Sequence, residues 1–148
     1  MADFQSSIII HKPVKEVFDY AWNLDNIPNI MPNVVRLEKV SAGPIGKGTK
    51  LLETRNIRGR EAKAEIEVTE YIPYKTYTTK SVAGGITIMY TYSFDEIEEG
   101  TQVQFEASVH IKGIFSFFSR RALVKILKQE DGYLLQYLKD EITKEENV

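Results

Sequence analysis

The sequence predicts one α+β domain in which a curved, seven-stranded antiparallel sheet is covered by a long C-terminal helix. Three observations predict this fold. A short β-branched segment is followed by helical stretches, six alternating segments follow between residues 34 and 111, and an apolar stripe at helical spacing closes the chain. The chain of 148 residues has the length of a single domain, and its 43% hydrophobic and 27% charged residues are typical of a globular protein.

Residues 4–11 form a short β-branched run, which predicts the first strand. Pro13 stands where a helix can begin, and a helical stripe then extends to Trp22 through Val14, Val17, Phe18 and Ala21. Residues 23–32 contain two prolines and three asparagines. They predict a short second helix or a turn that ends at Pro32.

Six further strands are predicted, each bounded by turn residues, at residues 34–40, 49–57, 61–68, 74–82, 86–94 and 102–111. Apolar and polar residues alternate most clearly in 61–68 and in the last two strands, which indicates strands with one buried and one wet face. A change of parity predicts a bulge near Thr69, and Gly84-Gly85 predicts a two-residue hairpin.

The C-terminal helix is predicted over residues 113–143. Its stripe consists of Phe115, Phe118, Ala122, Leu123, Ile126, Leu127, Tyr133, Leu134, Tyr137, Leu138 and Ile142. Charged residues, including Lys128 and Asp131, fall mostly off the stripe. Gly132 favours a bend or close packing inside the helix, and the polar residues 144–148 are expected to fray.

Bulk composition excludes several classes of protein. Nineteen basic and 21 acidic residues give a formal charge of −2, so the sequence lacks the basic excess of a dedicated nucleic-acid binder. Without cysteine, disulfides and thiolate chemistry are absent. The first residues do not resemble a signal peptide, and no apolar run approaches the roughly 18 residues of a membrane span. We therefore expect a cytoplasmic protein with no stable membrane insertion.

Four segments carry a family resemblance. Residues 10–18 (IHKPVKEVF), 24–34 (LDNIPNIMPNV), 43–49 (GPIGKGT) and 134–141 (LLQYLKDE) resemble, in this order, motifs of the START-related SRPBCC helix-grip superfamily. The similarity covers nearly the whole chain and points to the polyketide cyclase/dehydrase and lipid-transport branch. Met31 stands near a position where tryptophan is common, and Glu141 lies one place early.

This resemblance implies a helix-grip fold, in which the long helix leans across the concave face of the sheet and leaves a cavity for an apolar ligand. Members of the family bind or transfer ligands, and some are enzymes, so the fold alone does not assign the activity.

The first candidate site is therefore a cavity between the sheet and the C-terminal helix. Tyrosines are amphipathic, so they can hold an apolar ligand and anchor one polar group. The same residues can instead form a packed core, and the sequence leaves both interpretations open. The candidate residues are Tyr77, Ile88, Tyr90, Tyr92, Phe94, Phe105, Val109, Phe118, Ala122, Ile126, Tyr133 and Tyr137.

Two other segments are candidate sites. The phenylalanines of residues 115–118, beside Arg120 and Arg121, can touch a membrane transiently or gate a cavity, or simply begin a helix with solvated arginines. Glu53 and Arg55 share one strand face and can bind a polar head group if that face is internal. Because unpaired buried charge is costly, we expect them to be exposed.

Catalytic signatures are missing from the sequence. His11 and His110 are its only histidines and form no metal-binding or acid–base pattern, and no nucleophile elbow or phosphate loop is found. The sequence therefore predicts no metal and no cofactor. It favours a non-catalytic protein that binds or transports a small lipid-, quinone- or polyketide-like ligand. The alternatives are a polyketide cyclase/dehydratase-type enzyme that uses the same cavity, and a protein- or membrane-interaction module.

Overall fold

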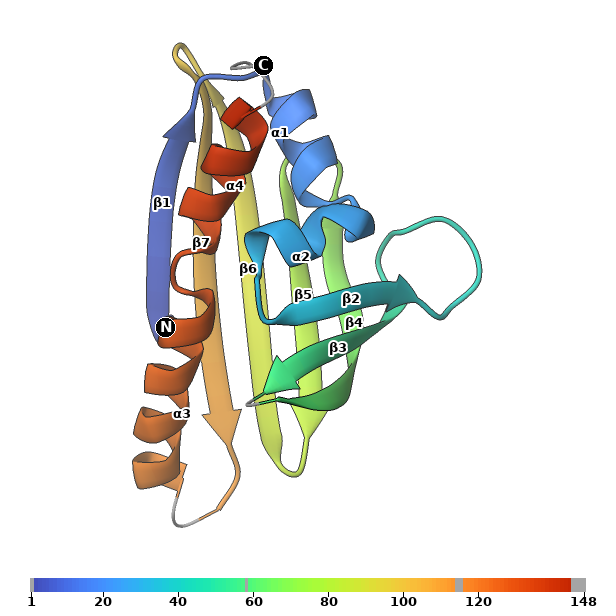
Figure 1. Cartoon of the computed structure of the whole chain (residues 1–148), viewed down its shortest axis with the longest axis vertical. Coiled ribbons are helices and arrows are strands. Elements are labelled where there is room, and N and C mark those ends of the chain that lie inside the picture. Colours follow the sequence, from blue (N-terminus) through green and yellow to red (C-terminus); the bar gives the residue numbers. More distant parts are fainter. Residues whose placement is uncertain (1, 58, 114–115, 145–148) are drawn as a thin grey trace.

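The structure, a computed structural model, describes residues 2–57, 59–113 and 116–144, with the backbone alone for Ile57 and residues 116–119. It confirms the predicted helix-grip architecture (Figure 1). The elements, in chain order, are β1 (Phe4–Ile10), α1 (Val14–Ala21), a 3₁₀ turn η1 (Leu24–Asn26), α2 (Ile27–Ile30), β2 (Val34–Lys39), β3 (Lys50–Ile57), β4 (Arg60–Ile72), β5 (Thr76–Ala83), β6 (Ile86–Ile97), β7 (Gly100–Ile111), α3 (Ser116–Asp131) and α4 (Leu134–Lys144).

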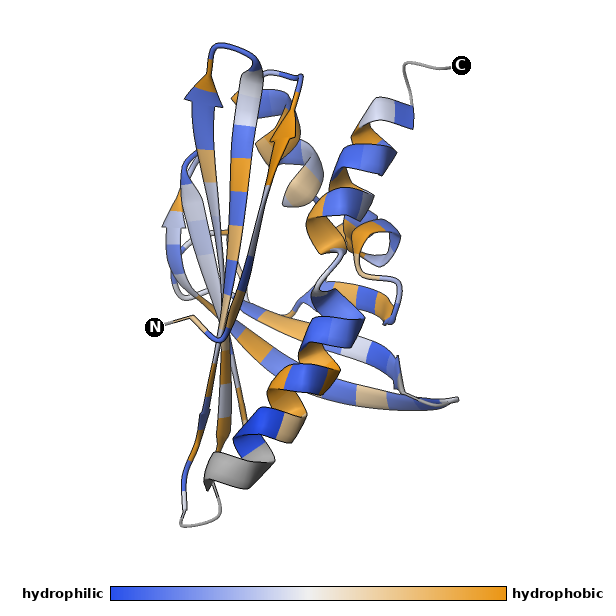
Figure 2. Ribbon diagram, turned by 90° about the vertical axis from the view of Figure 1, so that its left-hand side faces the viewer, coloured by the Kyte–Doolittle hydropathy of each residue, from blue (hydrophilic) through white to orange (hydrophobic). Residues whose placement is uncertain are grey.

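One antiparallel sheet contains all seven of these strands, in the order β1-β7-β6-β5-β4-β3-β2. Strands β2 to β7 follow one another as a meander, and β1 pairs with β7 at the far edge. Figure 2 shows that the helices lie on one side of the sheet and that the end of the sheet formed by β2 and β3 turns toward them. This curvature places the inner side chains of β3 opposite the C-terminal helices.

Two predicted turn features are confirmed. Gly84 and Gly85 both have positive φ, and Ala83 lies opposite Ile86, as in a two-residue hairpin. The register of β4 against β5 shifts between Val68 and Glu70, at the predicted bulge. In β4, β5 and β6 the residues that share a face are therefore those that the sequence predicts.

The C-terminal helix is interrupted at Gly132, where a bend was predicted. Gly132 and Tyr133 separate α3 from α4. A Cβ atom added to Gly132 would lie 2.2 Å from the carbonyl oxygen of Lys128, so only glycine allows the backbone to pass this close to the end of α3. The two helices also pack differently: α4 contacts α1, α2 and β1, whereas α3 contacts β7.

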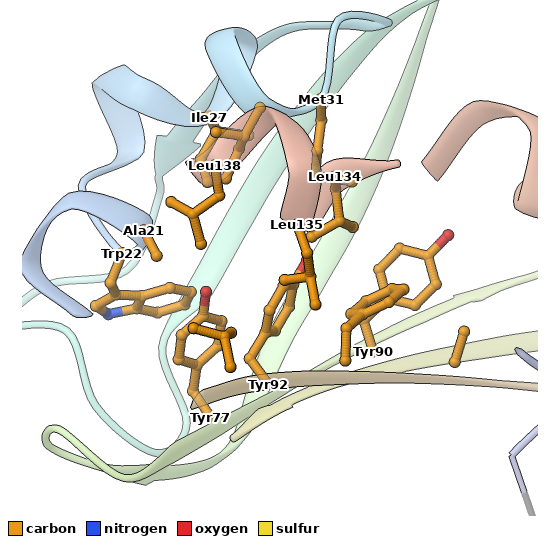
Figure 3. Close-up of a cluster of buried hydrophobic side chains, with 14 of the residues drawn as sticks. Ala21, Trp22, Ile27, Met31, Tyr77, Tyr90, Tyr92, Leu134, Leu135 and Leu138 are labelled. Atoms are coloured by element: carbon orange, nitrogen blue, oxygen red, sulfur yellow. The ribbon is translucent and has the colours of Figure 1, made fainter. Parts of the chain in front are cut away.

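Tight packing is found beneath α4. Its buried residues Leu134, Leu135, Leu138 and Ile142 are at most 4% exposed. In Figure 3 the leucines of α4 lie with Ile27 and Met31 above aromatic rings that rise from the sheet. In α3, among the side chains that the structure describes, only Leu127 and Asp131 are buried. The described part of α3 is therefore packed against the domain less tightly than α4. In the segment predicted to fray, Lys144 is the last residue of α4, and residues 145–148 lie outside the described residues.

Candidate functional site

A cavity of about 360 Å³ lies between α3 and the sheet. Four α3 residues form its helical side, and the inner faces of β3 to β6 form most of the opposite side. Trp22 directly after α1, Ile27 of α2, Met31 directly after α2 and Leu37 of β2 complete it. The lining residues are Trp22, Ile27, Met31, Leu37, Leu51, Glu53, Arg55, Ala64, Ile66, Tyr77, Thr79, Ser81, Ala83, Ile86, Ile88, Tyr90, Tyr92, Leu123, Ile126, Leu127 and Glu130.

The cavity has a buried end and an exposed end. Trp22 and Tyr77, which are 7% and 2% exposed, lie at the buried end with their rings 4.1 Å apart. Ala83, at the β5–β6 hairpin, and Ile126, on α3, are both exposed lining residues. The cavity therefore opens between this hairpin and α3.

Three tyrosines, Tyr77, Tyr90 and Tyr92, form the aromatic part of the sheet wall and are called the wall tyrosines below. Cross-strand register places Tyr77 opposite Tyr92, and their rings stack at 4.5 Å. Burial raises the pKa of each wall tyrosine above its ordinary value of 10, because a phenolate inside the protein would lose its hydration. These hydroxyls therefore stay protonated near neutral pH and keep a proton to donate; the Tyr90 hydroxyl donates it to Asp131.

A buried polar cluster occupies one side of the cavity and is called the Arg55 cluster below. Arg55 Nε donates to Glu53 Oε1 (2.6 Å), Nη1 to Glu130 Oε2 (3.2 Å), and Nη2 to Asp131 Oδ2 (3.1 Å). Tyr90 completes the cluster because its hydroxyl donates to Asp131 Oδ2 at 2.5 Å. Burial alone would lower the pKa of Arg55, but the Glu53 and Asp131 carboxylates outweigh burial and raise it, so Arg55 is charged at any accessible pH.

The expectation that Glu53 and Arg55 are exposed is wrong. Their side chains are only 12% and 13% exposed, and that of Asp131 is 1% exposed although the helical stripe had placed it outside the buried face. The reason is mutual pairing: each charge has opposite charges and hydrogen bonds within the cluster, which offset the loss of hydration.

A sequence signal for Glu53 and Arg55 did exist. The register that pairs Ile57 with Arg60 places Glu53 opposite Ala64 and Arg55 opposite Ala62. Because directly paired residues share a face, both charges follow the inward alanines of β4. Their helical partners lie 75 and 76 residues further along the chain, and no local pattern indicates them.

The structure brings only part of the predicted site together. Five predicted residues line the cavity: Tyr77, Ile88, Tyr90, Tyr92 and Ile126. Phe94, Phe105 and Val109 are buried in the core outside the lining. Ala122 on α3, Tyr133 in the break between the helices and Tyr137 on α4 are exposed, which corrects their predicted inward orientation. The break at Gly132 separates the stripe into two differently packed halves. The side chain of Phe118 lies outside the described residues.

The second predicted site also falls largely outside the described residues, which omit Phe115 and the side chain of Phe117. Arg120 is not simply solvated: it forms an ion pair with Asp3, and its Nε donates to the carbonyl of Val109 at 3.1 Å. Within the described ranges, no helix is long and apolar enough to cross a membrane. The described acidic and histidine side chains nowhere gather in a group of three suited to a metal ion.

Comparison with known proteins identifies the family. A sequence profile described as "Polyketide cyclase / dehydrase and lipid transport" matches residues 1–143. The comparison with curated proteins gives no significant match. Similar solved structures share the fold at low sequence identity.

Three of these structures show how similar the folds are and how low the sequence identities are. The chain superposes on Ara h 8.0201 with a TM-score of 0.73 and 14% identity, covering 95% of this chain and 97% of that one. The superposition on TTHA0849 from Thermus thermophilus has a TM-score of 0.73 and 20% identity, and it covers 93% of this chain and 94% of that one. The di-domain ARO/CYC StfQ from the steffimycin biosynthetic pathway gives 0.77 and 16%, covering 98% of this chain and 51% of that protein.

Proposed function

The chain belongs to the polyketide cyclase/dehydrase and lipid-transport family, and from this premise we propose that it binds or carries a small hydrophobic or amphipathic molecule in the cavity beneath α3. The observation that carries the proposal is the cavity itself. Its volume of about 360 Å³ lies within the range of ligand pockets, and apolar and aromatic residues line most of it.

The lining supplies apolar surface for the hydrophobic part of a ligand and hydroxyl groups for a polar part. Leu51, Ile66 and Leu127 offer apolar surface, and each methylene group buried there contributes about 0.8 kcal/mol. The wall tyrosines offer flat rings and protonated hydroxyls. Ten such groups would contribute about 8 kcal/mol, and ordering and desolvation offset part of this gain. We therefore expect dissociation constants of roughly tens to hundreds of micromolar for chains of about ten carbons.

Nile red, an uncharged dye that fluoresces in apolar surroundings, tests the proposal. We expect saturable binding of one dye per chain, with a change in the fluorescence of Trp22, the single tryptophan, at the buried end of the cavity. An Ala64→Phe variant fills the cavity and abolishes binding. Its control, Ala122→Phe, adds the same ring on the exposed side of α3 and leaves binding unchanged. Absence of saturable binding by the unmodified chain would refute the proposal.

A second candidate is a cyclase- or dehydratase-type reaction in the same cavity. The protonated Tyr92 hydroxyl and the Arg55 cluster favour it, because a hydroxyl donor can polarise a ligand carbonyl. Incubation with poly-β-ketone analogues, followed by mass spectrometry, tests for turnover. Turnover that survives Tyr92→Phe undiminished would remove this hydroxyl from the mechanism.

A further inference from the structure

Charge is unevenly distributed over the cavity wall. The Arg55 cluster contains one cation and three carboxylates, Glu53, Glu130 and Asp131, so its formal charge is 1 − 3 = −2. Arg55, Glu53 and Glu130 line the cavity directly, and they are the only charged residues in its described lining. A ligand therefore meets a wall with excess negative charge.

Arg55 is largely occupied by protein carboxylates and is therefore a poor anchor for an anionic ligand. Its Nε and both terminal nitrogens donate to protein carboxylates, and Nη1 reaches Asp131 as well as Glu130. These bonds use four of the five guanidinium N–H groups, so a ligand carboxylate could bind only the one remaining Nη2 N–H group or displace a protein carboxylate. It would then lie beside the remaining carboxylates, and like charges at this range repel strongly in a partly buried site.

One uncharged hydrogen-bonding group, the Tyr92 hydroxyl, is in contrast available in the cavity lining. Tyr92 is 7% exposed, and its hydroxyl makes no hydrogen bond to any residue that the structure describes. Figure 3 shows Tyr92 rising from the sheet toward the helices. The Nε1–H group of Trp22 also lacks a partner among the described residues, but this atom is fully buried and out of reach of a ligand. A ligand that offers a neutral oxygen acceptor can therefore gain a hydrogen bond from the Tyr92 hydroxyl without adding negative charge beside the Arg55 cluster.

We infer that the cavity selects uncharged apolar molecules carrying a hydroxyl or carbonyl oxygen and discriminates against carboxylate lipids of the same length. The inference rests on the proposed function and names its ligand class. The Arg55 cluster provides the discrimination by repelling the anion, and the unpartnered hydroxyl of Tyr92 provides the contact for the neutral oxygen.

Competition with Nile red at neutral pH tests the inference, using decan-1-ol and decanoate as a matched pair. We expect decan-1-ol to displace the dye at a concentration lower than decanoate by about tenfold or more. In Glu130→Gln, which keeps the shape of a side chain that is 25% exposed, this ratio falls by roughly threefold, because one negative charge is removed and Arg55 is partly released. Glu65→Gln, on the exposed face of β4, leaves the ratio unchanged.

The outcomes separate this inference from the proposed function. Decanoate binding as tightly as decan-1-ol overturns the inference and leaves the proposed function standing. A ratio that does not respond to Glu130→Gln overturns the role of the Arg55 cluster. If Nile red itself does not bind, the proposed function fails and the inference fails with it.

Discussion

Replacing Arg55 by methionine should strongly destabilise the fold, although Arg55 lies on a cavity wall. Methionine keeps much of the apolar stem but removes the only cation of the Arg55 cluster. Asp131, with a side chain that is 1% exposed, then loses both guanidinium contacts and retains only the Tyr90 hydroxyl. Glu53, at 12% exposed, loses a 2.6 Å contact.

The magnitude follows from burial. Breaking a buried ion pair by removing one partner costs about 3–5 kcal/mol. The lower end, about 3 kcal/mol, applies here because Glu130 is 25% exposed and the adjoining cavity gives water access to the carboxylates. For a chain of this length we expect a fall in Tm of about 6–12 °C.

Urea unfolding followed by the fluorescence of Trp22, which is 7% exposed, measures the effect. The double variant Arg55→Met/Asp131→Asn should lose less stability than the sum of the single variants, by about 1–2 kcal/mol. The asparagine amide is uncharged and still accepts from the Tyr90 hydroxyl. Arg36→Met is the control: Arg36 pairs with Glu38 at 3.5 Å with both side chains at least 43% exposed, so its loss should cost under about 1 kcal/mol.

Two results would contradict this reasoning. A loss for Arg55→Met no larger than that for Arg36→Met would show that the cluster carboxylates are hydrated without their cation. Strict additivity in the double variant would show that Arg55 and Asp131 are not energetically coupled.

Three further predictions concern the core and the backbone. Because the wall tyrosines have raised pKa values in the fold, stability should be constant below their ordinary pKa and fall above about pH 10, with tyrosinate absorbance showing that these three ionise only on unfolding. Gly132→Ala should cost about 1–3 kcal/mol through the clash with the end of α3, whereas Gly46→Ala, with nothing within 4 Å, should be nearly neutral in urea unfolding. Thr54→Val should raise the free energy of unfolding by about 1 kcal/mol because the fully buried Thr54 hydroxyl lacks a partner among the described residues. Thr101→Val should lower it by a similar amount because Thr101 donates to the Lys12 carbonyl at 2.8 Å; equal signs for the two threonines would contradict the argument.

The fold was predictable because its determinants are local. Alternation along β6 and β7, the Gly84-Gly85 turn and the parity change near Thr69 each fix a strand or a connection within a few residues of sequence. Once the strands pair as a meander, the remaining apolar stripe has only one face on which to pack. Gly132 was likewise identifiable as a break because glycine inside a helix is unfavourable.

The polar part of the site was not predictable to the same degree. Alternation in β3 is uninformative, because Leu51, Glu53 and Arg55 share the inner face while Thr54, on the other face, is fully buried. The charges of β3 can be buried because Glu130 and Asp131, which lie on α3 far along the chain, pair with Arg55. The cost of burying an unpaired charge, applied to Glu53 and Arg55 one at a time, therefore predicted that they are exposed. In the fold these charges are buried together as paired charges.

The interruption at Gly132 also has a kinetic consequence. The helix that covers the cavity, α3, buries few of its described side chains, whereas α4 is anchored by Leu134, Leu135 and Leu138. Detaching α3 exposes less apolar surface than unfolding the domain, so it requires less free energy. For the proposed ligand, we therefore expect the residence time to depend on α3, and the lifetime of the native state to depend on the sheet and α4. Amide hydrogen exchange should accordingly be faster in α3 than in α4.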